Sequence, residues 1–489
     1  MTSRETDTGP VVVGDDGVTW SDYERVVYQD ADVTLAGGET MARHRRELER
    51  QVADGAVIYA VNTGYGAESD QRIPSEAIER VQANTLRSHA VSVGDPVPEP
   101  IVRGMLLLKA QSYAQGPPAL RPAIAERLVE MLRRGITPVV YHAGSQSASG
   151  DLIPNAHVGL ASLLCEGDVW IDGRRVPAAT AGLQPLPPRM KEGVALTNDV
   201  SFAAALAFDL VREAERLILR AEQVAAMTLQ GLRGHPDAYH PRLVGARPHP
   251  GALETARHMR ELLADSELVR DAGRPHDPYS LRCIPQVHGA VRDAVATVRS
   301  SVEIELRSVA DNPLVFPDEP IALSGGNFHG APLGIPLDGA AVALTTLAAL
   351  SQRRTHHLVN PMFDVGLPAK LAASPSDQLG LIMVNTAAAA LVSECAAAAA
   401  PASVTSIAID PMEDHVSMAA LAAQKGHQIL RAARRAVACE LLCAARALDF
   451  QGPARASSPT RAMHEQVRRL IPLVADDRPV SIEPLEALL

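Results

Sequence analysis

A run of small residues occupies positions 144–152, Gly144-Ser145-Gln146-Ser147-Ala148-Ser149-Gly150-Asp151-Leu152, and a helix-like stretch follows it. Gly and Ser are ordinary turn formers, so one interpretation is a tight turn. The run is not the nucleophile elbow of serine hydrolases, because G-x-S-x-G around Ser149 needs a glycine where Ser147 stands. A different chemistry fits better. The Gly150 nitrogen can attack the Ala148 carbonyl only where side chains are small, and loss of water from that ring and from Ser149 leaves an electrophilic methylidene.

Five other segments place aromatic, basic and small residues in order along the chain: 59–66, 88–90, 279–289, 326–330 and 413–418. Together with the Ala-Ser-Gly triplet they make the chain resemble the aromatic amino acid ammonia-lyase and aminomutase family. In that family a 4-methylideneimidazol-5-one group (MIO) arises from such a triplet. Segments 279–289 (YSLRCIPQVHG) and 326–330 (GNFHG) match the family almost letter for letter. The resemblance spans roughly residues 55–420.

The resemblance implies a catalytic set. MIO would form from Ala148-Ser149-Gly150, with no external cofactor, and Asn198 would bind substrate and help MIO formation. Tyr59 would be the base that removes a weakly acidic β-proton, and Tyr279 would contact the substrate or intermediate beside the electrophile. Arg282 would bind the substrate carboxylate, for which a guanidinium offers a planar bidentate fork.

Each of these residues also has an ordinary structural interpretation. The tyrosines can be core aromatics, and Arg282 can be half of a surface ion pair. Asn198, as a lone asparagine, is often a helix cap. The segment around each residue favours the catalytic interpretation.

Two positions indicate the substrate. His89, in a segment that resembles the family's helix start for reading the substrate side chain, can hydrogen-bond a polar ring. Glu413, within Glu-Asp-His, resembles the histidine ammonia-lyase branch and can pair with an imidazole, although it can also be a structural carboxylate paired with an arginine. Phe328, His276 and Met412 complete the predicted substrate contacts. We therefore expect elimination of ammonia from L-histidine to give urocanate.

Several departures from the family pattern keep other functions open. His276 and Met412 stand where glutamine is usual, Asp199-Val200-Ser201 replaces Gly-Thr-Gln, and Ser147 replaces a glycine. One alternative is an MIO-dependent lyase or 2,3-aminomutase acting on tyrosine, phenylalanine or a specialised-metabolism substrate. Another is a non-catalytic helical scaffold in which MIO does not form, because loss of glycine at 147 or 199 restricts the backbone.

Helical periodicity dominates the rest of the chain. Apolar residues recur at spacings of three and four from Val287 through Val291, Ala294 and Val298 to Val302, which predicts a long amphipathic helix ended by 311–313. Other proline-free stretches predict helices over about 199–230, 338–358, 377–400 and 412–448, whereas 11–40 and 166–186 read as loops with short strands.

We therefore expect a mainly α fold: an elongated central bundle of long helices, with an N-terminal MIO-bearing region of loops and short helices. The predicted regions are 1–198, which carries the tyrosine loop and the triplet, and 199–489, the long-helix bundle, in one continuous structural unit. The resemblance implies a homotetramer with active sites shared between subunits. Ala-rich helices with few charges favour the same assembly, because a lone bundle exposes too much apolar surface.

Composition excludes several classes of function. The 489 residues carry a net charge of −11 and no basic stripe, so neither nucleic acid nor anionic lipid is an expected partner. The five cysteines form no CxxC pair, and the histidines at 356–357, 415 and 427 show no metal-ligand spacing. The apolar stretches at 340–350 and 386–400 are short or interrupted, and no signal peptide is visible. We expect a cytoplasmic protein without a metal.

Overall fold

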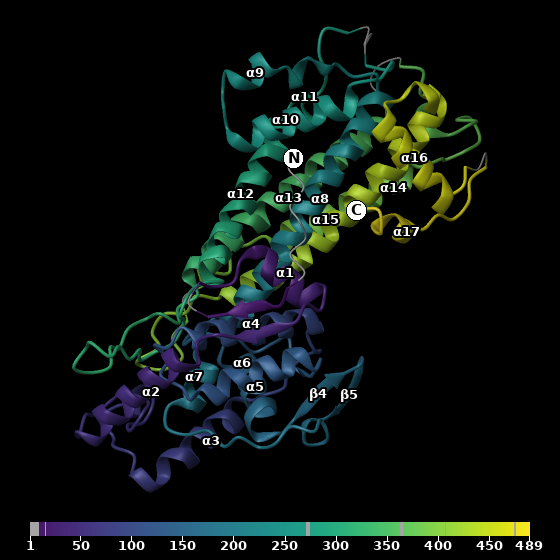
Figure 1. Ribbon diagram of the computed structural model, residues 1–489. Coiled ribbons are helices and arrows are strands. Elements are labelled where there is room, and N and C mark those ends of the chain that lie inside the picture. The colour runs from purple at the N-terminus through teal and green to yellow at the C-terminus, as the bar shows by residue number, and fades with distance from the viewer. Residues whose placement is uncertain (1–8, 15, 270–273, 362–364, 406, 474–475) are drawn as a thin grey trace. The chain divides into compact units, whose positions relative to one another are not determined.

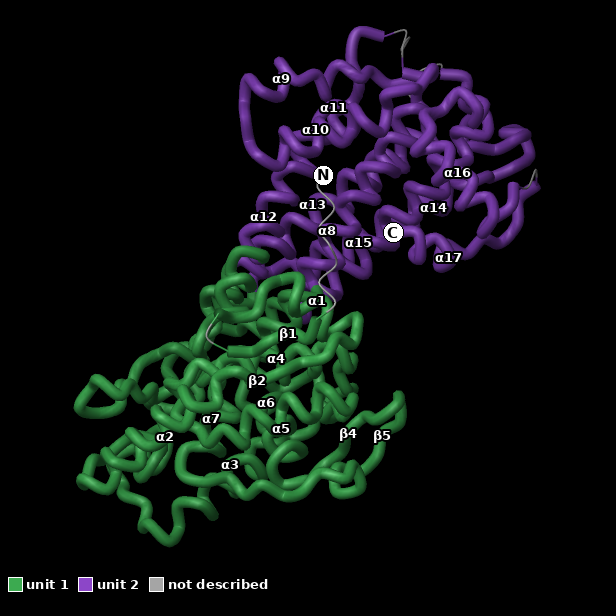
Figure 2. The backbone as a smooth tube through the Cα atoms, viewed as in Figure 1, with its two compact units in different colours: residues 1–209, 299–335, 402–423 green, residues 210–298, 336–401, 424–489 purple. Residues whose placement is uncertain are grey.

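The computed structural model describes residues 9–14, 16–269, 274–361, 365–405, 407–473 and 476–489, and it is mainly α (Figure 1). This confirms the predicted fold class. The chain forms two compact units (Figure 2): unit 1 contains residues 1–209, 299–335 and 402–423, and unit 2 contains 210–298, 336–401 and 424–489. The predicted regions 1–198 and 199–489 stay a prediction. The compact units do not follow them, because two later segments pack with the N-terminal part.

Unit 1 is built from short and medium helices with two small sheets. Its helices are α1 (Trp20–Tyr28), α2 (Gly38–Ala53), α3 (Ile78–His89), α4 (Glu99–Ala114), α5 (Pro122–Arg133), α6 (Leu152–Gly159) and α7 (Glu192–Thr197). Strands β1 (Val11–Val13) and β2 (Val33–Leu35) pair in parallel. Strands β3 (Thr137–Pro138), β4 (Asp168–Ile171) and β5 (Arg174–Pro177) form an antiparallel sheet.

Helix α4 is the core of unit 1. Its residues from Ile101 to Ala114 are all buried, as expected for a helix that is apolar nearly all round, and it packs against α1, α2 and α5. Helices α3, α6 and α7 pack against one another beside it. This second group brings the ends of three helices together, and those ends carry the triplet, His89 and Asn198.

Four long helices each contribute residues to both units: α8 (Ser201–Gly231), α12 (Ile284–Glu305), α13 (Ala331–Val359) and α15 (Ala419–Gln451). Unit 2 adds α9 (Pro241–Gly245), α10 (Pro250–Leu263), α11 (Tyr279–Arg282), α14 (Ile382–Ala398), α16 (Ser458–Leu470) and α17 (Glu483–Glu486). Small buried residues line the long helices, so their backbones pack closely.

A buried ion pair joins the long helices within unit 2. Arg354 of α13 donates to both carboxylate oxygens of Glu440 of α15 at 2.6 and 2.8 Å, and neither side chain is exposed. Thr228 of α8 and Ser351 of α13 donate to the same carboxylate, each at 2.7 Å. Because every charged oxygen is hydrogen-bonded, this buried pair holds three helices in register.

The long helices confirm the predicted periodicity, with shifted ends. Helix α13 begins before Pro336 rather than after it, and α14 and α15 begin a few residues later than predicted. The prediction of only loops and strands over 11–40 was wrong, because α1 lies there. Its signal is a capping box in which Thr19 and Asp22 each accept from the other's backbone N–H.

Two helical stretches, 192–231 and 331–359, are long and apolar enough to match membrane spans by length and composition. The most apolar window of the first stretch is 89% buried inside the protein, and that of the second stretch is 50% buried.

The carboxyl of Glu305, the last residue of α12, lies partly buried near Asp199. Burial first, and the Asp199 carboxylate second, raise the pKa of Glu305 from 4.5 to about 7. A folded-state pKa above the unfolded value means that the protonated side chain stabilises the fold at low pH. That stabilisation is lost as pH rises through 7.

The variant Glu305→Gln should lack this pH dependence. We expect the difference in melting temperature, variant minus wild type, to increase between pH 5 and pH 8. This increase corresponds to a change of about 1–3 kcal/mol in the relative free energy of unfolding. Differential scanning fluorimetry across this range measures it. Glu303→Gln, on the same helix but exposed, is the matched control and should give a flat difference. A flat difference for Glu305→Gln as well would contradict the raised pKa.

Candidate active site

The ends of three packed helices of unit 1 surround the Ala148-Ser149-Gly150 triplet. Helix α6 begins at Leu152, directly after it, α7 ends at Thr197, and α3 ends at His89. The expectation that His89 lies at a helix start was wrong, since it is the last residue of α3. The mutual packing of the three helices still brings His89 to the triplet.

The triplet is sharply folded, and its last residue must be glycine. Ala148 and Gly150 form an isolated antiparallel bridge around Ser149. Gly150 has φ +77°, and a Cβ there would lie 2.4 Å from the backbone oxygen of Asp199. A side chain is therefore excluded twice, by conformation and by space. The bridge brings the backbones of residues 148 and 150 together, as the predicted cyclisation requires.

Ser147, which stands in place of the family's glycine, adopts the left-handed conformation with φ +50°. Its hydroxyl donates to Asp151 Oδ1 at 2.7 Å and accepts from the backbone N–H of Ala420 at 3.2 Å. Its carbonyl accepts from the Ser417 hydroxyl at 3.0 Å. These bonds offset a backbone conformation that costs about 1–2 kcal/mol for a residue with a Cβ.

Asp151 organises the same turn from a fully buried position. Its carboxylate accepts from the hydroxyls of Ser145 (2.8 Å) and Ser147 (2.7 Å) and from the backbone N–H of Ala203 (2.8 Å). Burial raises the pKa of Asp151, while these hydrogen bonds act in the opposite direction. Asp151 was not among the site residues predicted from the sequence. Its position directly after the triplet was the available signal.

A cavity of about 430 Å³ opens beside the triplet. Its lining includes Ser88, His89, Gln146, Ala148, Gly150, Ile153, Ile409 and Glu413. Of the predicted site residues it thus brings together His89, Glu413 and two residues of the triplet. Ile409, Ile153 and Gln146 were missed, because nothing in an apolar or amide side chain by itself marks a cavity wall.

The two titratable residues of the cavity, His89 and Glu413, differ in hydrogen bonding. His89 Nδ1 lies 2.8 Å from the Thr85 carbonyl and donates to it in the neutral Nδ1–H tautomer, which leaves Nε2 as an acceptor. The Glu413 carboxylate accepts from the Ser149 hydroxyl at 2.6 Å. Within the described chain Glu413 makes no ion pair, so the alternative of a carboxylate bound to an arginine does not fit.

Tyr59 and Asn198 lie in unit 1 outside the cavity lining. The Tyr59 hydroxyl accepts from the Gly66 backbone N–H at 3.3 Å. Its neighbour Tyr65 lies 3.0 Å from Gln82 Nε2, and burial raises the pKa of Tyr65. Asn198 is the C-cap residue of α7, and its amide donates to the Asn312 carbonyl at 3.2 Å. Asn198 thus lies at a helix end, and its role in the site stays a prediction.

The remaining contacts predicted in unit 1 are more open. Phe328 is half-buried, and Met412 is 67% exposed in a turn where Asp410 accepts from its backbone N–H at 2.9 Å. Neither residue lines the described cavity.

Tyr279, Arg282 and His276 belong to unit 2 and are exposed, Tyr279 by 70%. The Arg282 guanidinium carbon lies 4.6 Å from the centre of the Tyr279 ring, a cation–π contact. Within the described chain Arg282 pairs with no carboxylate, so the surface ion pair alternative does not fit. Its five N–H donors remain available to an anion.

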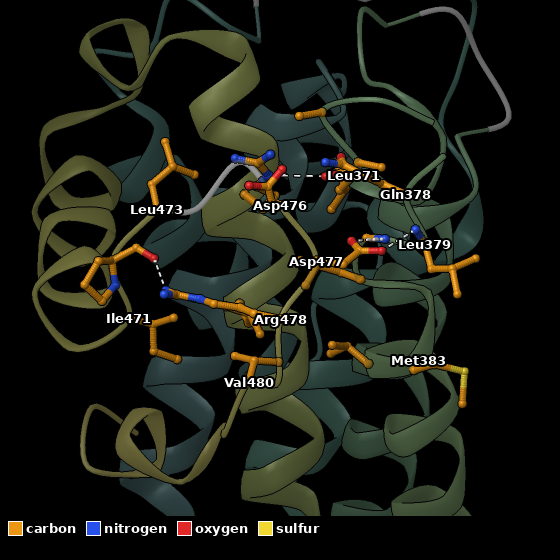
Figure 3. Close-up of a pocket in the computed structure, with 18 of the residues that line it drawn as sticks. Leu371, Gln378, Leu379, Met383, Ile471, Leu473, Asp476, Asp477, Arg478 and Val480 are labelled. Atoms are coloured by element: carbon orange, nitrogen blue, oxygen red, sulfur yellow. Dashed lines mark hydrogen bonds between the residues drawn. The ribbon is translucent and has the colours of Figure 1, made fainter. Parts of the chain in front are cut away.

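Unit 2 contains a separate cavity of about 550 Å³ whose wall includes Leu379, Met383, Ile471 and Val480 (Figure 3). At its edge the Asp477 carboxylate accepts from the backbone N–H groups of Leu379 (2.7 Å) and Gly380 (2.9 Å). None of the predicted site residues lines this cavity.

No group of three or more His, Cys, Asp or Glu side chains among the described residues could hold a metal ion. The five cysteines are free thiols, and Cys165, Cys395, Cys439 and Cys443 are buried.

Comparison with known proteins identifies the family of this site. The model of the aromatic amino acid lyase family matches residues 18–469. The chain belongs to the aromatic amino acid lyase family. It is 41% identical over 490 residues to a histidine ammonia-lyase of Geobacillus thermodenitrificans, covering 98% of this chain and 97% of that protein.

Solved structures show the same fold. The tyrosine aminomutase of Streptomyces globisporus has a TM-score of 0.91 at 33% identity, covering 98% of this chain and 96% of that one. The ergothionase of Treponema denticola, an ergothioneine-degrading enzyme, has a TM-score of 0.94 at 25% identity, covering 98% of both chains. The same all-α lyase fold therefore occurs in proteins with different activities, so the substrate must be argued from site residues.

The variant Gly150→Ala tests two costs of a side chain at the triplet: the unfavourable backbone conformation and the steric overlap with Asp199. Gly173 has a similar φ of +70° but open space around it, so Gly173→Ala is the matched control. We expect the control to lose only the conformational term, about 1–2 kcal/mol of stability. Gly150→Ala should lose a further ~1–3 kcal/mol from overpacking against Asp199. Denaturant titration measures both, and equal losses would contradict the close approach.

Proposed function

We propose that this protein is an ammonia-lyase that converts L-histidine to urocanate and ammonia. One observation carries the proposal: His89 and Glu413, two groups complementary to an imidazole, line the same cavity as the Ala-Ser-Gly triplet. The 41% identity to a histidine ammonia-lyase over nearly the whole chain supports the same substrate.

We further propose that MIO forms from Ala148, Ser149 and Gly150. The residues fit this group, because the triplet carries only small side chains, Gly150 excludes a Cβ, and the bridge brings residues 148 and 150 together. When formed, MIO supplies an electrophile that activates the substrate for loss of ammonia. No external cofactor is needed for this elimination.

The substrate ring is recognised by a donor–acceptor match. His89 Nε2 accepts from an imidazole N–H in the tautomer that its bond to Thr85 favours. The Glu413 carboxylate accepts from the other ring nitrogen when that nitrogen carries a proton. A phenyl ring offers neither donor, so binding it would leave both groups unpaired in a partly buried site.

The remaining residues act on the amino acid moiety. Arg282 binds the substrate carboxylate through its guanidinium, which has no carboxylate partner in the described chain. Tyr59 removes the β-proton, and Tyr279 contacts the substrate beside the electrophile. Asn198 binds substrate at the end of α7, and Phe328, His276 and Met412 complete the contacts.

A 2,3-aminomutase is the second candidate function. The 33% identity and TM-score of 0.91 to a tyrosine aminomutase favour it, as do the exposed His276 and Met412 where the family has glutamine. An aminomutase returns ammonia to the β-carbon instead of releasing it. The difference lies in how long the site stays closed over the amine.

Amino acid panels with a charge-neutral variant test the substrate. We expect the wild type to form urocanate from L-histidine, with little product from L-tyrosine or L-phenylalanine. Ultraviolet absorbance and amine analysis measure the products. Glu413→Gln keeps the size of the side chain and, before MIO forms, an acceptor for the Ser149 hydroxyl, but it loses the charge that pairs with the substrate ring. It should lower histidine turnover by a factor on the order of 10–100, from about 1.5–3 kcal/mol.

Two controls define the result. Asp414→Asn removes an exposed charge beside Glu413 and should leave turnover unchanged. Ser149→Ala should retain the fold and lose turnover. A β-amino acid product would establish the aminomutase. If intact mass shows that the wild type has lost two water molecules, so that MIO has formed, and histidine is still not converted, the histidine assignment is refuted.

We also propose a homotetramer with shared sites and a cytoplasmic location. Tyr279 is 70% exposed, and α14 buries only Val384, Ala388 and Cys395 within this chain, which leaves an almost uncharged face open. Sedimentation should give four times 51.9 kDa, and an active monomer would contradict the assembly. Five free cysteines favour the cytoplasm, which cell fractionation can test.

A further inference from the structure

A completely buried lysine pairs with Asp199, whose backbone lies against Gly150 of the triplet. Lys109 of α4 has no exposed side-chain surface, and its ammonium group donates to Asp199 Oδ2 at 2.7 Å and to the Leu196 carbonyl at 2.9 Å. The chain has only four lysines. A buried charge is costly unless it is paired, so this pair constrains the position of Asp199.

Asp199 connects the lysine to the triplet. Its backbone carbonyl accepts from the Asp151 backbone N–H at 2.7 Å and from Asn155 Nδ2 at 3.0 Å. Its Oδ1 accepts from Asn155 Nδ2 and from the Ser201 N–H, both at 2.9 Å. Asp199 stands where the resemblance to the family predicts glycine, so Lys109 holds a side chain that this resemblance does not predict.

The backbone of Asp199 forms the surface against which Gly150 lies. A Cβ on Gly150 would meet the oxygen, carbon and nitrogen of Asp199 at 2.4–2.8 Å. Any displacement of Asp199 therefore moves Gly150, whose nitrogen must reach the Ala148 carbonyl. A misplacement of ~1 Å can slow a proximity-dependent step by on the order of 10²-fold.

The position of Asp199 depends on the positive charge of Lys109, because other acidic side chains lie nearby. Asp151, Asp311 and Glu305 are further acidic side chains close to Lys109 or Asp199. Without the ammonium group, the buried Asp199 carboxylate would lose its countercharge and remain near these acids. Repulsion from these acids would then displace Asp199, and the displacement disturbs the backbone against which Gly150 lies.

We propose that Lys109 is a positioning residue for MIO formation, acting through Asp199. This inference rests on the proposed function. In the step concerned, a bond forms between Gly150 N and the Ala148 carbonyl carbon. The carbonyl oxygen leaves as water with the protons of the Gly150 and Ser149 N–H groups. The Ser149 hydroxyl then leaves as water with the Ser149 Cα hydrogen, so the step needs no oxidant or reductant.

Intact mass followed over time after expression measures this step directly, as the loss of two water molecules from the full-length protein. We expect Lys109→Met to lose water on the order of 10²-fold more slowly than the wild type. Arg103→Met is the matched control: Arg103 is a buried cation on the same helix, but it donates to Val26 and pairs with Asp30. It should lower the melting temperature and leave the rate of water loss unchanged.

A double-mutant cycle identifies the route through Asp199. Asp199→Asn retains the Oδ1 acceptor but loses the ion pair, so it should also slow water loss. The double variant Lys109→Met/Asp199→Asn should be no slower than the slower single variant, because both lose the same pair. Additive slowing would overturn the route through Asp199.

Each outcome decides the proposal. Unchanged water loss in a folded Lys109→Met variant overturns it. If that variant does not fold, Asp199→Asn provides the test, and an unchanged rate there overturns the proposal instead. A wild type that never loses water would refute MIO formation itself. If the wild type loses water and every variant loses it at the same rate, only the role of Lys109 is refuted.

Discussion

The contact between Gly150 and the backbone of Asp199 constrains the part of unit 1 that carries the site. No side chain fits between the two residues, so the start of α6 and the end of α7 must lie at backbone distance from each other. The packing of α3 against both helices then places His89 at the same point. The cavity beside this close approach is lined by the imidazole of His89, the carboxylate of Glu413, and Ala148 and Gly150 of the triplet.

Buried polar groups hold the close approach in place. Asp151 accepts three hydrogen bonds, and Asp199 pairs with Lys109 and accepts from Asn155. The Ser147 hydroxyl accepts from the Ala420 N–H at the start of α15. Partnered charges in a low-dielectric interior define geometry well, because each alternative arrangement leaves a group unpaired. The two departures from the family's glycines are thus accommodated by hydrogen bonds and an ion pair, which argues against the scaffold alternative.

The groups proposed to act on the amino acid are divided between the units. Unit 1 holds the triplet, His89 and Glu413 in one cavity, whereas Tyr279 and Arg282 lie exposed in unit 2. An exposed tyrosine packed against an arginine that lacks a carboxylate partner is typical of a surface that is completed by another molecule. A site assembled from several subunits is consistent with this division.

The sequence by itself determined the family, the long helices and the triplet, because small-residue runs and apolar spacing are local properties. It also pointed to His89 and Glu413 through short segments. Only the tertiary structure decided that His89 ends its helix, that Ile409 and Gln146 line the cavity, and that Lys109 pairs with Asp199. Lys109 and Asp199 are 90 positions apart, and no local pattern marks a pair formed by helix packing.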